Sequence, residues 1–266
     1  MRRRQPAVAG TFYPGDERAL ESFVRPYADP ARRGNDVRVL VGPHAGYIYS
    51  GGICGEGYAE VRVPGTVMVI GPNHTGLGAS NAIVASGAFA LPGGDLPIDE
   101  PLAQELMMRA GFVDDDVAHR REHSIEVHLP FLRAKNPDVK FVPLCLGRAR
   151  YETCERMGLA IARVLADRSD VLVVVSTDMS HYISAAQARE LDTMAIAHVL
   201  AVDPKALFDT VVANDISMCG FIPTTVALVA ARELGSTQGR LVRYGNSGER
   251  SGDYGRVVGY ASAVIG

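Results

Sequence analysis

Residues 171–181 read VLVVVSTDMSH, and the first five of them decide the fold class of this chain. The run 171–175 is apolar throughout and mostly β-branched, a pattern typical of a strand that is buried on both faces of a sheet. Similar runs occur at residues 37–41 (VRVLV) and 67–70 (VMVI). Several such strands in one chain indicate a sheet that is covered by helices on both sides.

Stretches with helical periodicity separate these strands. Asp99 is a typical N-cap for a helix over residues 100–109, and Gly235 is a typical C-cap for a helix over residues 224–234. The remaining predicted elements are helices over residues 125–134 (with Ser124 as the cap), 151–166 and 185–201, and strands over residues 139–146, 240–244 and 256–265. The alternation predicts an α/β protein, a three-layer α/β/α sandwich with a mostly parallel central sheet, formed as a single domain by residues 1–266.

The composition is that of an ordinary globular protein. Hydrophobic residues make up 47% of the chain and charged residues 21%, and the net charge of -3 points to neither a nucleic-acid nor a membrane partner. The apolar runs have the length of strands, and Pro6 and Gly10 interrupt the start, so we expect neither a membrane span nor a signal peptide. The four cysteines include no CxxC pair and are too few for a disulfide framework. A cytoplasmic location is therefore expected.

A histidine follows each of three predicted strands. His44 follows the run 37–41, His74 follows the run 67–70, and His181 closes the segment that begins at residue 171. Ligands of open α/β sheets bind beyond the carboxyl ends of the strands, so these loops converge on one crevice if the strands are parallel neighbours. A single histidine is more often structural, but three in this position favour a metal site, because imidazole is the commonest protein ligand for metals.

A metal site needs a further ligand, and two residues are candidates. Asp178, close to His181, is either a ligand or a carboxylate that orients a neighbouring group. Cys219, in the segment 217–220 (SMCG), could bind a metal as a thiolate, although a buried inert cysteine is the more common case. The other three cysteines lie in helix or strand patterns and are interpreted as core residues.

The segment 122–128 (EHSIEVH) carries two more histidines. It is not an HExxH zinc motif, because His123 and His128 are five residues apart and residues at that spacing do not share a helix face. His123 precedes the predicted cap Ser124 and could point into a pocket from the start of a helix. His128 is interpreted as structural.

Taken together in their order, these motifs resemble those of the Memo family. The segments that carry the resemblance span nearly the whole chain, and they are residues 6–14 (PAVAGTFYP), 43–47 (PHAGY), 71–74 (GPNH), 122–130 (EHSIEVHLP), 176–181 (STDMSH) and 219–220 (CG). The Memo family is similar in structure to the class III (LigB-type) extradiol dioxygenases. The resemblance therefore implies the same α/β/α fold with one metal pocket.

The resemblance also implies roles for individual residues. It assigns His44, His74 and Cys219 as metal ligands, places Asp178 and His181 in the same pocket, and matches His123 to a pocket histidine of the dioxygenases. Those enzymes bind Fe(II) through two histidines and a carboxylate. Cys219 stands at the carboxylate position here, which weakens the expectation of ring cleavage and favours iron or copper over zinc.

Three functions follow from these expectations. The first is a metal-dependent redox enzyme acting on a small molecule of unknown identity, in which His181 acts as acid and base and Asp178 orients it. The second is a peptide-binding or signalling module that retains a dioxygenase-like pocket. The third is a protein that stores or delivers iron or copper. Whether the chain is an enzyme stays open at this point.

Overall fold

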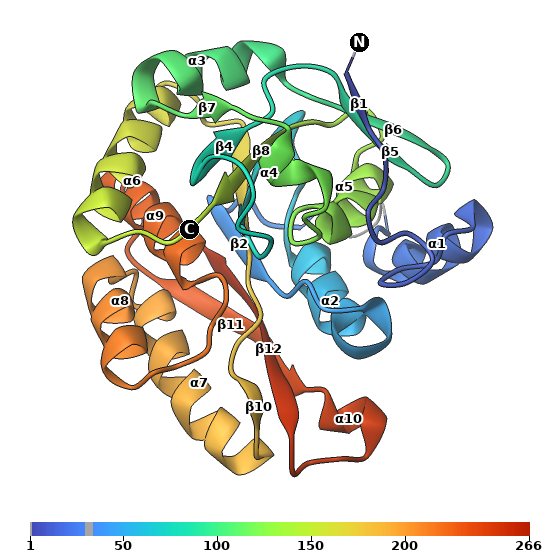
Figure 1. The fold of residues 1–266 in the computed structure, drawn as a ribbon, viewed down its shortest axis with the longest axis vertical. Helices are drawn as coiled ribbons and strands as arrows, with labels where there is room; N and C mark the ends of the chain where they lie inside the picture. Colours follow the sequence, from blue (N-terminus) through green and yellow to red (C-terminus); the bar gives the residue numbers. More distant parts are fainter. Residues whose placement is uncertain (1, 30–33) are drawn as a thin grey trace.

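The computed structural model describes residues 2–29 and 34–266, which form a large β-sheet between two layers of helices (Figure 1). The strands are β1 Arg3–Arg4, β2 Val39–Gly42, β3 Thr66–Pro72, β4 Asn81–Ile83, β5 Ala88–Leu91, β6 Gly94–Pro97, β7 Val113–Asp114, β8 Lys140–Leu146, β9 Val171–Ser176, β10 His181–Ile183, β11 Gly239–Asn246 and β12 Val257–Ile265. The helices are α1 Glu17–Val24, α2 Gly52–Glu60, α3 Glu100–Ala110, α4 Val117–Arg120, α5 Leu129–Lys135, α6 Tyr151–Leu165, α7 Ala185–Leu200, α8 Pro204–Ala213, α9 Phe221–Glu233 and α10 Gly248–Ser251.

The central sheet has the strand order β10-β12-β2-β9-β3-β8-β4-β7, with β11 paired to the other edge of β12. The four middle strands, β2, β9, β3 and β8, are parallel, whereas β12 and β4 run antiparallel to them. Strands β1, β5 and β6 form a separate small sheet. The fold class predicted from the sequence is confirmed: the protein is an α/β protein with a mixed, mostly parallel central sheet.

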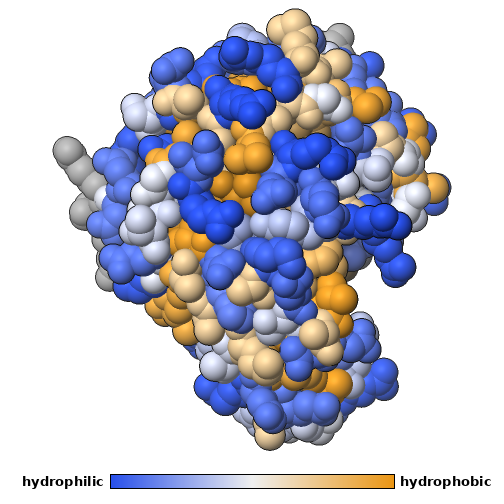
Figure 2. All heavy atoms as spheres, turned by 90° about the vertical axis from the view of Figure 1, so that its left-hand side faces the viewer, coloured by the Kyte–Doolittle hydropathy of each residue, from blue (hydrophilic) through white to orange (hydrophobic). Residues whose placement is uncertain are grey.

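Helices cover both faces of this sheet. On one face α9 packs against β2, β3 and β9, with α6 and α8 beside it, and on the other α2 packs against β2 and β12. The middle strands are buried on both sides: every residue of β9 and of β2 is buried. Figure 2 shows the side of the molecule that lies at the left of Figure 1, where the helices turn mainly hydrophilic side chains to the solvent among smaller apolar patches.

Most predicted elements are present within a few residues of their expected bounds, and one differs. The helix expected over residues 125–134 begins only at Leu129, after a 3₁₀ turn at Glu126–His128. Ser124 does not cap it, because its hydroxyl donates to the carbonyl of Pro72 and its backbone N–H donates to the carboxylate of Glu122. The segment is thus held by contacts to other loops, which outweigh the local preference for a helix.

Pro143 does not interrupt β8. The strand pairs with β3 along its whole length, but with β4 on its other edge only at Leu144, Cys145 and Leu146. The missing N–H of the proline therefore leaves no partner in the sheet unsatisfied. Among the residues that the structure describes, no helix combines the length and the apolar character that crossing a membrane requires.

Candidate metal centre

The three strands that end in histidine loops are neighbours in the sheet. Strand β9 lies between β2 and β3, and all three run in the same direction. The loops after them therefore meet at one edge, as the sequence predicted. The His44 and His74 rings lie 5.0 Å apart between centroids, although they come from loops thirty residues apart along the chain.

His44 is buried, and one of its ring nitrogens is fixed by a serine. Its Nδ1 lies 2.6 Å from the hydroxyl of Ser176, and that hydroxyl donates its only proton to the carbonyl of Ser124 at 2.5 Å. Nδ1 of His44 must then be the donor toward Ser176, which leaves a lone pair on Nε2. Burial lowers the pKa of His44 well below its ordinary value, so the ring stays neutral and its Nε2 can bind a metal.

His74 is fixed in the same way by a buried carboxylate. Its Nδ1 donates to Oε1 of Glu122 at 2.9 Å, and its backbone N–H donates to Oε2 at 2.6 Å. Burial raises the pKa of Glu122, but the hydrogen bonds from His74 and from the backbone of Ser124 outweigh it and bring the pKa to about 2. Glu122 is therefore ionised at neutral pH, and it leaves the lone pair of His74 on Nε2.

We predict that Glu122→Gln weakens metal binding without unfolding the protein. The amide keeps the shape of the side chain but removes the charge that orients His74 and makes it more basic, so the affinity should fall by about 10–100-fold. Titration with a metal-binding competitor measures this change. Glu105→Gln serves as the control and should bind metal like the wild type. Glu105 lies on α3, and its carboxylate accepts hydrogen bonds from Arg109 and Arg168. An unchanged affinity in Glu122→Gln would contradict the orienting role.

His123 completes a group of three imidazoles. One ligand atom of each of His44, His74 and His123 lies within 4.8 Å of the other two, and a metal ion could be held among them. The ring of His123 stacks on His74 with centroids 4.7 Å apart and also contacts Phe12, with centroids 4.8 Å apart. Burial lowers its pKa, so it too is present mainly as neutral imidazole. Unlike the other two, it comes from a turn and not from a strand end.

Cys219 reaches the same site from the loop before α9. Its Sγ lies 3.3 Å from Nε2 of His44 and accepts a hydrogen bond from the backbone N–H of Asp178. The adjacent Gly220 explains the close approach of this loop, because a Cβ on Gly220 would lie 2.4 Å from the carbonyl oxygen of Ser176. Burial raises the pKa of the Cys219 thiol, so the thiolate form needs a nearby cation.

Asp178 contacts His44 through both oxygens of its carboxylate. Its Oδ1 accepts the backbone N–H of His44 at 2.8 Å, and its Oδ2 lies 3.9 Å from Nε2 of the same residue. Burial raises its pKa to about 6, against the effect of the hydrogen bond from His44. Asp178 therefore holds the His44 loop through the backbone, and one of its oxygens faces the candidate metal position.

His181 is partly exposed and lies at the start of β10. Its Nδ1 donates to the carbonyl of Ser217 at 2.9 Å, and its backbone N–H donates to the hydroxyl of the same serine. Because a carbonyl can only accept, this bond leaves Nε2 of a neutral His181 free to take a proton. The charge of His181 also lowers the pKa of Asp178, which places the two groups close together.

All the residues singled out from the sequence thus lie in one region, and three further residues act on them. Glu122, Ser176 and Ser217 fix the rings of His74, His44 and His181 respectively. Ser176 could have been suspected from its place at the end of a strand, and Glu122 from its place beside His123. Their actual partners are distant in sequence and were not predictable.

The imidazoles of His44, His74 and His123 could hold a metal ion, and the sulfur of Cys219 lies beside one of them. A tetrahedral ion with bonds to nitrogen and sulfur of about 2.0–2.3 Å separates its ligand atoms by roughly 3.3–3.8 Å. The distance between Cys219 Sγ and His44 Nε2, 3.3 Å, lies in this range. In addition, His44 and His74 each present an unprotonated Nε2 whose partner nitrogen is bound to protein, which is the usual arrangement of metal-binding histidines.

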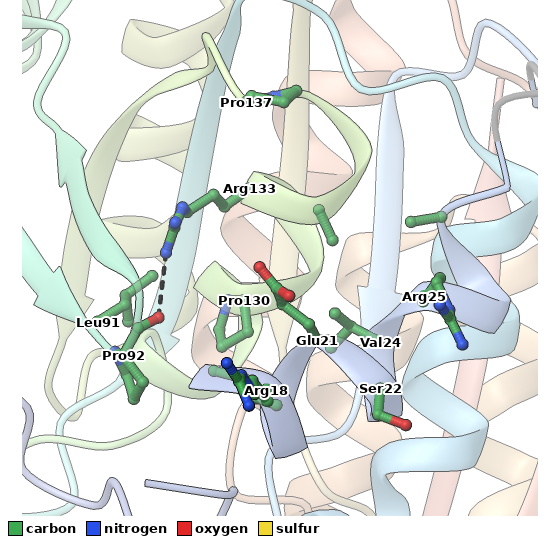
Figure 3. Close-up of a pocket in the computed structure, with 13 residues that line it drawn as sticks. Arg18, Glu21, Ser22, Val24, Arg25, Leu91, Pro92, Pro130, Arg133 and Pro137 are labelled. Atoms are coloured by element: carbon green, nitrogen blue, oxygen red, sulfur yellow. Dashed lines mark hydrogen bonds between the residues drawn. The ribbon is translucent and has the colours of Figure 1, made fainter. Parts of the chain in front are cut away.

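A large groove lies elsewhere on the molecule. It has a volume of about 600 Å³ and is formed by α1, α5 and the turn after β5 (Figure 3). Arg133 reaches across it to the carbonyl of Pro92 at 3.1 Å, and Arg18, Glu21 and Arg25 line its α1 side. None of the residues of the candidate centre lines this groove, so cavity size does not identify the site, and the donor geometry does.

Comparison with known sequences gives a consistent result. The Memo-like protein family matches residues 4–264. A MEMO1 family protein of Aquifex aeolicus is 38% identical over 268 residues, covering all of both chains. A MEMO1 family protein of Methanopyrus kandleri is 39% identical over 279 residues, covering 98% of each chain. These relatives match the chain from end to end, as the motifs had indicated.

Comparison with solved structures supports the fold alone. An uncharacterized protein of Escherichia coli K12 superposes with a TM-score of 0.52 over 86% of this chain and 99% of its own. The two sequences are only 12% identical, so the likeness carries no information about the chemistry of the site.

Proposed function

The chain belongs to the Memo-like protein family, and we propose that it is a metal-dependent redox protein that holds iron or copper through His44, His74 and Cys219. The observation that carries this proposal is the pair of unprotonated Nε2 atoms, each oriented by a hydrogen bond to the opposite ring nitrogen. The sulfur of Cys219 adds a soft donor, which suits iron and copper.

Three residues are candidates for the third ligand. Cys219 approaches Nε2 of His44 more closely than Asp178 does, at 3.3 Å against 3.9 Å. His123 also offers a ring nitrogen to the same space. We propose that Cys219 is the ligand and that His123 faces the bound substrate. The second assignment rests on the contact of His123 with Phe12, a side chain that is only half-buried.

A bound iron or copper ion would supply one-electron chemistry and an open coordination position. The residues of this chain supply the proton transfers. His181 has a free Nε2 and a fixed Nδ1, so it can accept a proton from a substrate hydroxyl and return it later. Asp178 keeps the His44 loop in place by accepting the backbone N–H of His44, and the charge of His181 lowers the pKa of Asp178.

His181→Ala should lower turnover while leaving the metal in place. Loss of a general acid–base typically costs about 10²–10⁴-fold in rate. The measurement is oxygen uptake by the iron-loaded or copper-loaded protein with catechols as the first probes, together with metal content. Turnover equal to that of the wild type would remove the acid–base role of His181. A loaded protein that oxidises none of the probes would favour storage or delivery of the metal.

A further inference from the structure

Directly behind the candidate centre lies a buried group of polar side chains that the proposed function does not use. Tyr58 on α2 and His128 in the turn before α5 are fully buried, and Cys54 is 3% exposed. The hydroxyl of Tyr58 lies 3.2 Å from Nδ1 of His128, and Sγ of Cys54 lies 3.7 Å from the same nitrogen. Nε2 of His128 has no hydrogen-bond partner among the described residues.

The count of protons decides the direction of the Tyr58–His128 bond. If Nδ1 carried the proton, the hydroxyl proton of Tyr58 and the lone pair on Nε2 would both lack a partner. If Tyr58 donates to Nδ1, only the N–H at Nε2 lacks one. Burying an unsatisfied polar group is costly, so the second arrangement is favoured and Tyr58 is the donor.

The pair lies against the strand that carries His44. A Cβ on Gly42, two residues before His44, would lie 3.3 Å from Cε1 of His128 and 3.7 Å from Sγ of Cys54. His128 is also among the imidazoles whose charge lowers the pKa of His44, after burial itself. His128 therefore lies against the end of β2, two residues before His44, and Tyr58 contacts His128.

The ring of Tyr58 also belongs to an aromatic cluster. The ring of Tyr58 stacks on Phe131, with centroids 5.1 Å apart and an angle of 7° between the planes. Phe131 in turn contacts Tyr47 at 5.1 Å and Tyr27 at 6.0 Å. Tyr27 is only partly buried. Through the ring of Phe131, the cluster thus links Tyr58 to two further tyrosines, one of which is partly exposed.

We propose that Tyr58 is a redox-active tyrosine, which gives up an electron to the metal centre and its phenolic proton to His128 when the reduced centre meets peroxide without substrate. This inference rests on the proposed function, because it needs a redox-active metal in the site. Its consequence is protection: Tyr58 is oxidised in place of Cys219, whose sulfur would otherwise be converted to sulfenic and sulfinic acid.

The step balances with hydrogen peroxide as the oxidant. One peroxide molecule receives one electron from ferrous iron and one from Tyr58, takes two protons from the solvent, and becomes two water molecules. Tyr58 becomes a neutral phenoxyl radical, and its proton remains on Nδ1 of His128, which becomes imidazolium. Phenols are oxidised readily only when the proton can leave at the same time, so a base at hydrogen-bond distance is the requirement that His128 meets.

A second buried tyrosine near the centre provides the matched control. Burial and then the charge of Asp178 raise the pKa of Tyr260, which places its hydroxyl near the site. No described residue offers that hydroxyl an imidazole or carboxylate at hydrogen-bond distance. Tyr260→Phe therefore removes a phenol close to the site that has no base beside it.

The test uses the full chain loaded with Fe(II), with iron content measured first. The protein is mixed with hydrogen peroxide, frozen at once and examined by electron paramagnetic resonance, with ring-deuterated tyrosine to identify a tyrosyl signal. Oxidation of Cys219 is followed by peptide mass spectrometry. The wild type and Tyr260→Phe should give the radical. Tyr58→Phe, which keeps the ring stacked on Phe131, should lose most of it and show severalfold more oxidised Cys219.

The outcomes separate this inference from the function on which it rests. A wild type that binds iron but gives no tyrosyl radical would overturn the inference alone. The same holds if Tyr58→Phe keeps the full signal and the same level of Cys219 oxidation. A wild type that binds neither iron nor copper would overturn the proposed function, and the inference with it. Circular dichroism checks that Tyr58→Phe is folded, and His128→Asn gives an independent variant that removes the base and leaves the phenol.

Discussion

Replacing His44 and His74 together by Ala is expected to leave the purified protein without bound iron or copper. The two rings supply the unprotonated Nε2 atoms. Each ring is oriented by a hydrogen bond at its Nδ1, to Ser176 for His44 and to Glu122 for His74. The remaining donors are Cys219, whose thiol is kept protonated by burial, the carboxylate of Asp178 and the single imidazole of His123, and we expect them not to retain the ion without the two histidines. Elemental analysis of protein purified without added metal measures the loss.

The control for this experiment removes an imidazole elsewhere. His198 lies on α7, where its Nε2 is paired with the hydroxyl of Thr210, and it takes no part in the candidate centre. His198→Ala should keep the metal content of the wild type. A double variant of His44 and His74 that still contains the wild-type amount of metal would show that the proposed site is wrong.

Single variants identify the third ligand. Cys219→Ala should lose most of the metal if the sulfur is a ligand, whereas His123→Ala should retain it. The reverse result would assign the third position to the imidazole of His123, which the geometry of the three rings also allows. The charge-transfer absorption of a bound thiolate, present in the wild type and absent in Cys219→Ala, gives a second readout that does not depend on affinity.

Glu126→Ala is expected to cause the largest loss of stability. Its buried carboxylate accepts hydrogen bonds from Arg4 at 2.6 Å, from the backbone of Ala7 at 2.8 Å and Val8 at 3.0 Å, and from Tyr13 at 2.7 Å. The side chain of Arg4 is only 9% exposed. Removing one partner of such a buried pair leaves the other charge uncompensated, at a cost of about 3–5 kcal/mol in the free energy of unfolding.

Chemical denaturation measures this loss, and a neighbouring ion pair supplies the control. Arg3 pairs with Asp95 on the surface, where the two side chains are 52% and 38% exposed. Asp95→Ala should therefore cost no more than about 1 kcal/mol. Equal effects of the two substitutions would show that the Glu126 pair contributes no more than an ordinary surface ion pair.

The Glu126 variant should also disturb the metal centre, because Arg4 holds the loop that carries Glu122 and His123. Its Nη2 donates to the carbonyl of Glu122 at 2.5 Å and its Nε to the carbonyl of His119 at 2.7 Å. The segment before α1 is therefore part of the support of the site. This support could not be predicted, since three arginines at residues 2–4 are typical of an ordinary solvated terminus and Glu126 lies 122 residues from Arg4.

The fold and the site differ in how far the sequence alone determined them. An apolar β-branched run such as the one in β9 predicts its own burial without information from the rest of the chain, because a strand without polar residues must be buried on both faces. The position of His44 and His74 just after such strands then follows from the general geometry of parallel sheets. The alternation of elements and the three converging loops could therefore be predicted.

Tertiary structure alone decided the states of the site residues. The tautomer of His74 depends on Glu122, which lies 48 residues further along the chain, and that of His44 depends on Ser176, 132 residues away. Cys219 joins the site only because Gly220 lets its loop approach the end of β9. Hydrogen bonds between distant segments leave no periodic trace in a sequence. The sequence by itself therefore determined where a metal-binding site should form, whereas the packing of loops from opposite ends of the chain determined which atoms face the metal.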